Sequence, residues 1–444
     1  MRDRSPTHRK PLPISPSMIR PLLSLFLSGL VTFRAFGAPN ETAPKTGVNI
    51  PLTDASRFGP PQAQGEQTEE MKQLLQAGIY EGQKSSLTFL RWKGANPPVV
   101  FQVGLWGPQI TNEHAALLPS LSEIEALSFY ETSVDDSAVP AIAKLPNLRT
   151  LAFAPVDRYQ KTGFTRMQWS YPWLPKLENR PRLTGKALSV LSTIPSLDTL
   201  DLRDTHVDPA SLEALGRCPK LADLGLPHPI DAEAIRHLQA CKHLGALILG
   251  GREIRSSEIE RLAALPSLKR LTLRNARIPN ETLAALAKLE KLTTLSIYDC
   301  GLTDAQLAHL GKPPALNRLE LVRNEIEGHG LSALAPFALK KLDLTFNNLS
   351  DASLSRLPAL DTLEELSLAY CVSVSDGGIR SGILQKMTHL QMLELRGLTK
   401  VTDASLEELS QFGHLKLIGI REANVSWQSV DQMRAAMPAT KVFK

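Results

Sequence analysis

The chain has 444 residues, of which 43% are hydrophobic and 21% charged, so it can bury a large apolar core and is not disordered as a whole. Four cysteines in this length exclude a disulfide-rich scaffold. The net charge of +5 arises in residues 1–37, which hold six basic residues and one acidic residue; the remainder has 44 of each sign. A neutral remainder gives no reason to expect nucleic acid or an anionic membrane as a partner.

The N-terminal segment has the order of an export signal. Residues 21–33 form an uncharged, mostly apolar stretch after a basic residue, and residues 35–37 (Ala-Phe-Gly) supply small residues for cleavage. The stretch is too short for a spanning helix, which needs about 20 apolar residues, and no globular pattern around it favours a buried helix. We therefore expect a signal peptide over 1–37, with its start at Met1 or Met18, and a periplasmic or extracellular protein without stable membrane insertion.

Two short segments separate this signal from the repeats. Residues 38–64 hold five prolines among polar residues, a composition typical of a flexible linker. Residues 66–80 show helical spacing of apolar residues, and residues 86–92 (SLTFLRW) have the composition of a strand. We interpret residues 65–99 as an N-terminal cap.

A repeat of 23 to 27 residues occupies the rest of the chain, interrupted once by a spacing of 49. Its pattern is L-x-x-L-x-L, with two weaker copies at the start. The first positions of the thirteen units are Val100, Ile124, Leu148, Leu197, Leu221, Leu244, Leu268, Leu292, Leu316, Leu339, Leu363, Leu390 and Leu415. Self-similarity at such a period predicts a solenoid in which each unit buries its apolar face against its neighbours.

Each unit has two phases. Leu295 and Ile297 lie two residues apart, as in a strand with one buried face, whereas Leu307 and Leu310 lie at helical spacing. Thr303 begins the helical phase in the motif T-D-x-x-L, which offers an N-cap oxygen and then a first-turn carboxylate. The same signal recurs at Ser350-Asp351 and Thr402-Asp403. The sequence therefore predicts an α/β solenoid with a parallel sheet inside and short helices outside.

These units resemble the leucine-rich-repeat superfamily, and the T-D-x-x-L phase is most similar to its ribonuclease-inhibitor and F-box-associated subclasses. The resemblance covers residues 100–444 and implies a right-handed horseshoe with a concave parallel sheet and convex short helices. No F-box-like module is evident, and the export signal does not fit a cytosolic ubiquitin-ligase adaptor. The usual Asn at the ninth position is kept at Asn324 and Asn347, while Cys300, Cys371, Thr132 and Thr205 replace it elsewhere. Pro108, Pro229, Arg252 and Leu398 depart from the pattern, so we expect an irregular turn in those units.

An insertion of about 25 residues, 157–181, accounts for the double spacing. It is rich in aromatic and basic side chains, including Tyr159, Arg166, Trp169, Tyr171 and Trp173. One interpretation is a degenerate fourteenth unit, or a loop whose aromatic rings pack on the solenoid. The other is a protruding recognition loop with residue types common in binding hot spots.

Two cysteines occupy one phase of neighbouring units. Cys218 precedes Leu221 by three residues, and Cys241 precedes Leu244 by three. Stacking of the units could bring their Cα atoms within the about 4.4–6.8 Å that a disulfide needs, and export would supply an oxidising compartment. We predict a possible Cys218–Cys241 bridge, with Cys300 and Cys371 as buried thiols.

The sequence contains no motif for catalysis, a cofactor or a metal. HExxH, zinc-finger cysteine pairs, GxSxG, GxxxxGK[ST] and a GxGxxG after a strand are all missing. The repeat phase explains several histidines and the recurring aspartates. We therefore predict that the protein is not an enzyme, and that it needs no cofactor or metal; an enzyme with a site of unfamiliar type is the remaining alternative.

The concave face is the expected binding surface, because the third, fifth and seventh positions of each unit point out of it. These positions carry Trp106, Tyr130, Asp201, Arg203, Arg270, Arg274, Tyr298, Arg318, Glu320, Lys341, Asp343, Glu394, Arg396 and Arg421. Charges of both signs with interspersed aromatic rings suit a protein partner, although a merely solvated face is the simpler interpretation of any single residue.

The resulting hypothesis is an exported, monomeric repeat protein that binds another protein. Its binding site would combine the concave face with the insertion, through Trp106, Tyr130, Tyr159, Arg166, Trp169, Tyr171 and Trp173. The insertion leaves the third unit just after Phe153, next to the strands that carry Trp106 and Tyr130. The main alternative is a carbohydrate- or anion-binding protein that uses the aromatic, basic insertion.

Overall fold

We describe a computed structural model of the chain, for residues 89–93, 99–106, 109–130, 132–153, 183–203, 205–226, 230–251 and 253–444. The chain divides into two compact units, Met1–Lys45 and Thr46–Lys444, and all described residues belong to the second. The predicted signal peptide, the linker, the helix at 66–80 and the insertion lie outside the described residues. What the sequence predicts for these segments stays a prediction.

Fifteen strands form one sheet in chain order within the described residues. They are β1 (Phe89–Lys93), β2 (Val99–Trp106), β3 (Ala126–Tyr130), β4 (Thr150–Ala152), β5 (Thr199–Asp201), β6 (Asp223–Gly225), β7 (Ala246–Gly250), β8 (Arg270–Arg274), β9 (Thr294–Tyr298), β10 (Arg318–Val322), β11 (Lys341–Asp343), β12 (Glu365–Ser367), β13 (Met392–Glu394), β14 (Leu417–Gly419) and β15 (Lys441–Phe443). Strands β2 to β15 are parallel, and β1, the strand predicted at 86–92, pairs antiparallel with β2.

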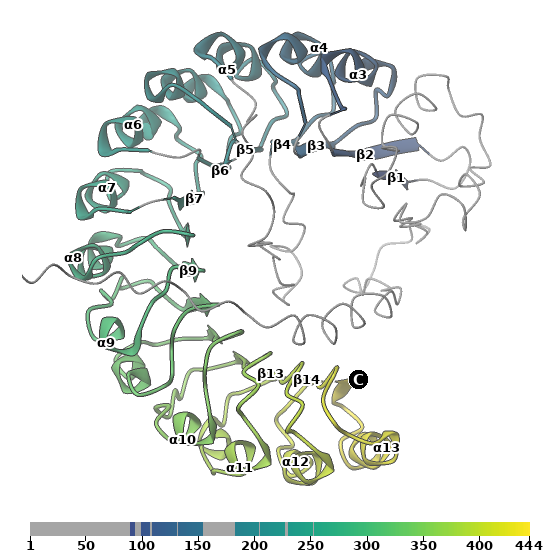
Figure 1. The fold of residues 1–444 in the computed structure, drawn as a ribbon, viewed down its shortest axis with the longest axis vertical. Coiled ribbons are helices and arrows are strands. Elements are labelled where there is room, and N and C mark those ends of the chain that lie inside the picture. Colours follow the sequence, from purple (N-terminus) through teal and green to yellow (C-terminus); the bar gives the residue numbers. More distant parts are fainter. Residues whose placement is uncertain are drawn as a thin grey trace, which may run out of the picture. The chain divides into compact units, whose positions relative to one another are not determined.

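Short helices connect the strands. The α-helices are α3 (Asn112–Ala116), α4 (Val139–Ile142), α5 (Gly185–Leu191), α6 (Ala232–His237), α7 (Ser256–Leu262), α8 (Asn280–Ala285), α9 (Asp304–Leu307), α10 (Asp351–Leu354), α11 (Asp376–Ile379), α12 (Asp403–Leu409) and α13 (Trp427–Ala436). The 3₁₀ turns are η2 (Leu118–Ser120), η3 (Asp136–Ala138), η4 (Pro209–Arg217), η5 (Leu238–Ala240), η6 (Leu286–Lys288), η7 (Leu331–Leu334) and η8 (Leu384–Lys386). Along the array of repeats, the strands line the inner side of the curve and the helices line its outer side (Figure 1).

The leucine positions of the repeat build one continuous core between sheet and helices. In the unit that begins at Leu292, Leu295 and Ile297 of β9 have no exposed surface, and Leu307 of α9 is 1% exposed. Equivalent positions pair across the strands, as Leu319 pairs with Leu342. The predicted parallel sheet, its register and the alternation of strand and helix are therefore confirmed, and the fold is an open leucine-rich-repeat solenoid.

The ninth position ties each unit to the one before it. Asn324 accepts hydrogen bonds from the backbone N–H groups of Cys300 (3.2 Å) and Leu302 (3.1 Å) and donates to the carbonyl of Ile297 (2.9 Å). Where cysteine replaces asparagine, the Cys371 thiol donates to the carbonyl of Leu344 at 3.3 Å. A thiol is a weak donor and offers only one hydrogen, so cysteine keeps one bond of the asparagine ladder and loses the others.

The aspartate that opens a helix also binds the following unit. Asp376 at the start of α11 accepts from the backbone N–H (2.8 Å) and the hydroxyl (2.6 Å) of Thr402, the N-cap of α12, and from the Ser405 hydroxyl. Asp351 makes the same two bonds to Ser375, at 2.7 and 2.6 Å. The sequence predicts these carboxylates only as first-turn residues of their own helices. In the structure they also form hydrogen bonds to the following unit.

Candidate functional site

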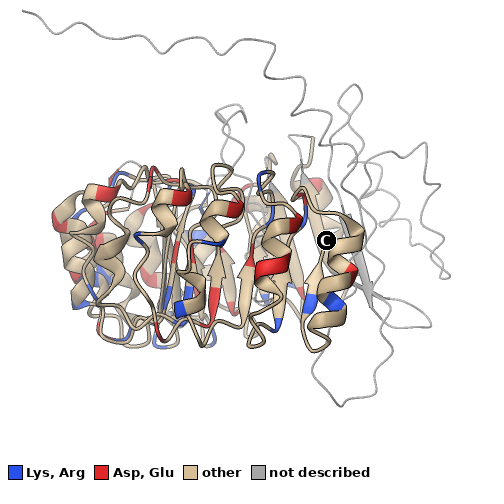
Figure 2. Ribbon diagram, turned by 90° about the horizontal axis from the view of Figure 1, so that it is seen from below, with Lys and Arg blue, Asp and Glu red and all other residues tan. Residues whose placement is uncertain are grey.

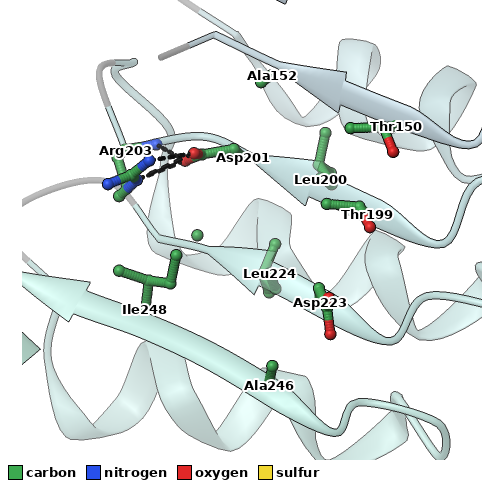
Figure 3. Close-up of a pocket in the computed structure, with 11 residues that line it drawn as sticks. Thr150, Ala152, Thr199, Leu200, Asp201, Arg203, Asp223, Leu224, Ala246 and Ile248 are labelled. Carbon is green, nitrogen blue, oxygen red and sulfur yellow. Dashed lines mark hydrogen bonds and ion pairs between the residues drawn. The ribbon is translucent and has the colours of Figure 1, made fainter. Parts of the chain in front are cut away.

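The concave face carries a hollow over β4–β7. Its residues belong to two rows that run across the strands in register. The third positions are Thr150, Thr199, Asp223 and Ala246, and the fifth positions are Ala152, Asp201, Gly225 and Ile248. Three of these residues are alanine or glycine, and Ala152 and Ala246 are themselves only 2% and 5% exposed. The resulting hollow has a volume of about 80 Å³ and a mostly apolar lining, which also includes Leu200, Leu224 and Arg203 (Figure 3).

Two carboxylates border the hollow, and an arginine is paired with each. Arg203 donates from Nε to both Asp201 oxygens (2.9 and 3.0 Å) and from Nη2 to Oδ2 (2.6 Å). Their side chains are only 14% and 12% exposed. Arg270 of β8 reaches across to Asp223, with Nη2 2.5 Å from Oδ1. The edge of the hollow is therefore polar, but each carboxylate is balanced by a cation.

Gly225 is required by the position of the Asp201 carboxylate. A Cβ atom at residue 225 would overlap Asp201 Oδ1 and its carboxyl carbon, so any other residue there must displace the side chain of Asp201. The glycine thus leaves room for the Asp201 carboxylate. The Asp201–Arg203 pair lies at one end of the hollow in Figure 3.

Further along the face, β9–β11 hold a closed polar cluster centred on Glu320. One carboxylate oxygen accepts from the hydroxyls of Tyr298 (2.5 Å) and Ser296 (2.9 Å), and the other from the ammonium of Lys341 (2.7 Å). Glu320 and Lys341 are 7% and 8% exposed. Sequence analysis placed these residues on the concave face as groups for a partner; the structure shows that they bind one another instead.

The charges of this cluster stabilise each other against burial. Burial would raise the pKa of Glu320, but the Lys341 charge and the three hydrogen bonds outweigh it, so the pKa lies below the ordinary value. Burial would lower the pKa of Lys341, yet Glu320 and Asp343 hold it above the ordinary value. Both groups therefore stay ionised at neutral pH, while burial and the neighbouring Glu320 charge raise the pKa of Tyr298.

Glu394 on β13 is the exception among these carboxylates. Its side chain lies over Gly419 of β14, where a Cβ would overlap both carboxylate oxygens. The backbone N–H of Arg396 donates to it at 3.0 Å. Burial raises the pKa of Glu394 to about 7, since the nearby Arg396 and Arg421 only partly offset it and Asp343 adds to it. This carboxyl group therefore titrates near neutral pH.

A ridge follows the edge where the strands end. In eight successive units the eighth position has a positive φ angle, at Gly251, Asn275, Asp299, Arg323, Phe346, Tyr370, Gly397 and Glu422. Bulky side chains in this conformation are strained, and here they contact one another. Phe346 and Tyr370 stack at 4.7 Å between ring centres, and Arg323 lies 5.0 Å from the Phe346 ring. The Tyr370 hydroxyl donates to Glu422 at 2.8 Å.

The residues chosen from sequence as a binding site are only partly described. The register pairs Trp106 of β2 with Tyr130 of β3, in the same row at adjacent strands. Tyr159, Arg166, Trp169, Tyr171 and Trp173 lie outside the described residues. The contribution of all seven to binding stays a prediction. The hollow itself was missed, although a signal for it exists in the run of small residues at the third and fifth positions of β4–β7.

Cys218 and Cys241 are both buried, and both are free thiols in the structure. Burial raises the pKa of Cys218 to about 11. Burial, with a smaller contribution from the neighbouring Cys218, raises that of Cys241 to about 12. The bridge stays a prediction, and mass mapping of exported protein under non-reducing conditions is its test.

Among the described residues no cluster of three or more His, Cys, Asp or Glu side chains could hold a metal ion. In the same part of the chain, no helix has the length and apolar character that crossing a membrane requires.

A family profile described as a leucine-rich repeat matches residues 338–357, the unit that contains β11 and α10. The match agrees with the repeat read along the whole array and with its open parallel sheet. This agreement supports membership of the chain in the leucine-rich-repeat superfamily. No curated protein sequence matches it significantly.

Several solved structures are similar to the chain at low sequence identity. An internalin of Listeria monocytogenes is 17% identical, with 85% of this chain and 94% of that one covered and a TM-score of 0.42. A leucine-rich-repeat protein of Leptospira interrogans is 15% identical, over 74% and 92%, with a TM-score of 0.32. TLR13 in complex with ssRNA13 is 18% identical, over 74% and 47%, with a TM-score of 0.48. Similarity at this level carries no information on function.

Proposed function

We propose that this protein is an exported binding protein without catalytic activity, which contacts a protein partner through the concave face of its sheet. The observation that carries the proposal is the hollow over β4–β7. It is an apolar depression with a polar edge of paired charges, and protein interfaces commonly have an apolar core and a polar rim. Acidic and basic residues are interspersed along the array (Figure 2), which suits a protein surface better than a polyanion.

The lack of catalysis is inferred from how the titratable side chains are used. Glu320 and Lys341 satisfy each other, and Asp351 and Asp376 fasten neighbouring units. The hollow of about 80 Å³ is also well below the roughly 300–1,000 Å³ of small-molecule sites. These observations favour contact with a macromolecule over turnover of a small substrate.

The export part of the proposal rests on the order of charged, apolar and small residues over 18–37. The part played by the insertion, residues 157–181, rests on its aromatic and basic composition and on its attachment. It follows β4, and two residues of that strand, Thr150 and Ala152, line the hollow. Aromatic and arginine side chains in the insertion would extend the contact area beside it.

Site-specific photo-crosslinking in the cells that produce the protein tests the proposal. The full chain carries a photoreactive amino acid at Thr272, on the concave side of β8, or at Glu260, an exposed residue of α7 on the outer side. We expect one protein adduct from the Thr272 label and none from the Glu260 label. Adducts from Glu260 alone, or none from either, would contradict binding by the concave face.

The same material separates the remaining parts of the proposal. N-terminal sequencing of the adduct should begin near Ala38, and intact Met1 or Met18 in a cytosolic fraction would contradict export. The rival carbohydrate reading predicts retention on polysaccharide that disappears when residues 158–180 are replaced by a short Gly-Ser linker. For a protein partner, Trp169→Ala or Trp173→Ala should weaken binding at least about thirtyfold without lowering the melting temperature.

A further inference from the structure

We propose that the hollow over β4–β7 receives a single uncharged aliphatic side chain of the protein partner. This inference rests on the proposed function and specifies the chemistry of the contact. Three observations support it: the volume of the hollow, the pairing of the charges around it and the apolar side chains at its floor.

Size limits the occupant to one small group. The hollow measures about 80 Å³, roughly half of the about 150 Å³ apolar cavity that holds a benzene molecule. An aromatic ring therefore does not fit, whereas the branched end of Val, Leu or Ile, or the end of Met, does. A free metabolite would make too few contacts in this volume to be held.

Charge complementarity makes the occupant neutral. Arg203 donates three hydrogen bonds to Asp201, and Arg270 is paired with Asp223. An incoming ammonium or guanidinium group would have to displace one of these arginines, and an incoming carboxylate would lie next to Asp201. Either exchange leaves a charge without its counter-charge in a partly dehydrated place, which is costly.

The floor of the hollow favours an apolar group over water. Ala152, Ala246 and Ile248 present no side-chain donor or acceptor there, while the Asp201 carboxylate covers Gly225. Water above these three residues has few side-chain partners, and its displacement by an aliphatic group is favourable. The polar groups lie at the two ends in Figure 3, with Asp201 and Arg203 at one and Thr150, Thr199 and Asp223 at the other. They would contact polar atoms of the partner on either side of the inserted side chain.

The test uses a defined probe, a displayed library of random twelve-residue peptides, selected on the full chain. We expect the selected peptides to share one Val, Leu, Ile or Met anchor. A synthetic copy of the best peptide should lose at least tenfold in affinity, measured by fluorescence polarisation, when this anchor becomes Ala. Charged or aromatic anchors, or a library that yields no binder, would overturn the inference.

Matched variants of the protein locate the anchor. Ala246→Leu fills the hollow from the third position of β7, and Thr294→Leu adds a similar side chain at the third position of β9, two strands away. The first should weaken the peptide at least tenfold, and the second less than twofold, with circular dichroism spectra showing that both variants are folded at the assay temperature. Ile248→Ala enlarges the hollow, so a peptide with Phe as its anchor should then bind better than the original.

Failure of this inference is distinguishable from failure of the proposed function. If Ala246→Leu and Ile248→Ala leave peptide affinity and anchor preference unchanged, the hollow is not the contact, yet the Thr272 photo-adduct can still form. If that adduct never forms, the proposed function fails whatever the peptides do. If peptides bind only after residues 158–180 are replaced by a linker, the hollow is filled by this chain itself and the assignment to a partner is wrong.

Discussion

The concave face is built in two different ways along its length. Over β4–β7 its side chains are small, and a hollow lies between paired charges. Over β9–β11 its side chains are large and polar, and Glu320 collects hydrogen bonds from Tyr298, Ser296 and Lys341. Both stretches occupy the same positions of the same repeat, so the difference is a choice of side chain and not of backbone.

The charged residues over β9–β11 stabilise the face itself, whereas the hollow over β4–β7 is a surface that a partner can enter. A polar cluster whose members satisfy one another offers little to a partner, because each new contact would replace an existing one. A hollow with an apolar floor gains from being covered. Tyr298, Glu320 and Lys341, which the sequence places on the concave face, therefore stabilise the face itself, whereas the proposed contact lies over β4–β7.

The largest expected effect lies in the polar cluster. Glu320→Ala leaves the Lys341 ammonium buried without its main counter-charge, which should lower the free energy of unfolding by about 3–5 kcal/mol. Urea denaturation followed by circular dichroism measures this. Ala246→Leu, in the other region, enlarges a side chain that is only 5% exposed, and it should lower the same quantity by no more than about 1–3 kcal/mol.

A double variant sharpens the interpretation. Glu320→Leu combined with Lys341→Met removes both charges, and it should be far less destabilised than Glu320→Ala. Equal losses in the single and double variants would mean that the packing of these side chains, and not their ionic pairing, supports β10 and β11.

The next effect concerns the aspartates that join successive units. Asp376→Ala removes the acceptor for the N–H and hydroxyl of Thr402 and for the Ser405 hydroxyl, which should cost about 1–3 kcal/mol of unfolding free energy. The exposed Asp361, changed in the same way, is the matched control and should cost less than about 0.5 kcal/mol. A loss of similar size at both positions would show that Asp376 does not fasten the two units.

How well the sequence predicts a structural feature depends on how many repeats take part in forming it. The strand at Leu295, the helix after Thr303 and the shared register follow from periodicity and capping, which act within one unit or between identical positions. The bonds of Asp376 to Thr402 could not be predicted in this way, because they depend on the angle between two units. The hollow and the burial of Glu320 depend on three or four neighbouring strands at once, so the sequence of one repeat does not indicate them.

Glu394 adds a pH dependence opposite in sign to that of Glu320, whose pKa lies below the ordinary value. Its pKa of about 7 in the folded chain lies above the ordinary carboxyl value of 4.5, so the folded state holds a proton that the unfolded chain releases. Its stabilising contribution is complete below about pH 4.5 and is lost as the pH rises through 7. Between these values stability should fall by at most about 1.4 kcal/mol per pH unit.

Urea denaturation of the full chain at several pH values from 5 to 8 measures this contribution. Glu394→Gln keeps a neutral side chain over Gly419, so the difference between wild type and variant should change with pH in the stated direction. Glu407→Gln, on the exposed side of α12, is the matched control and should not alter the pH profile. A profile for Glu394→Gln parallel to that of the wild type would contradict the assignment.

The smallest effect is expected on the ridge, where a second tyrosine allows a direct comparison with the cluster. Tyr370 donates to Glu422 at the half-exposed edge (2.8 Å), whereas Tyr298 donates to Glu320 (2.5 Å) under the neighbouring side chains. Water can replace the hydroxyl of Tyr370 as a donor to Glu422, so Tyr370→Phe should cost less than about 0.5 kcal/mol of unfolding free energy. Water has no such access to Glu320, and Tyr298→Phe should cost about 1.5–3 kcal/mol, as expected for a buried hydrogen bond to a charged group. If the two substitutions cost the same, the ridge is as closed to solvent as the cluster, and the division of the face into a structural stretch and an open one does not extend to its edge.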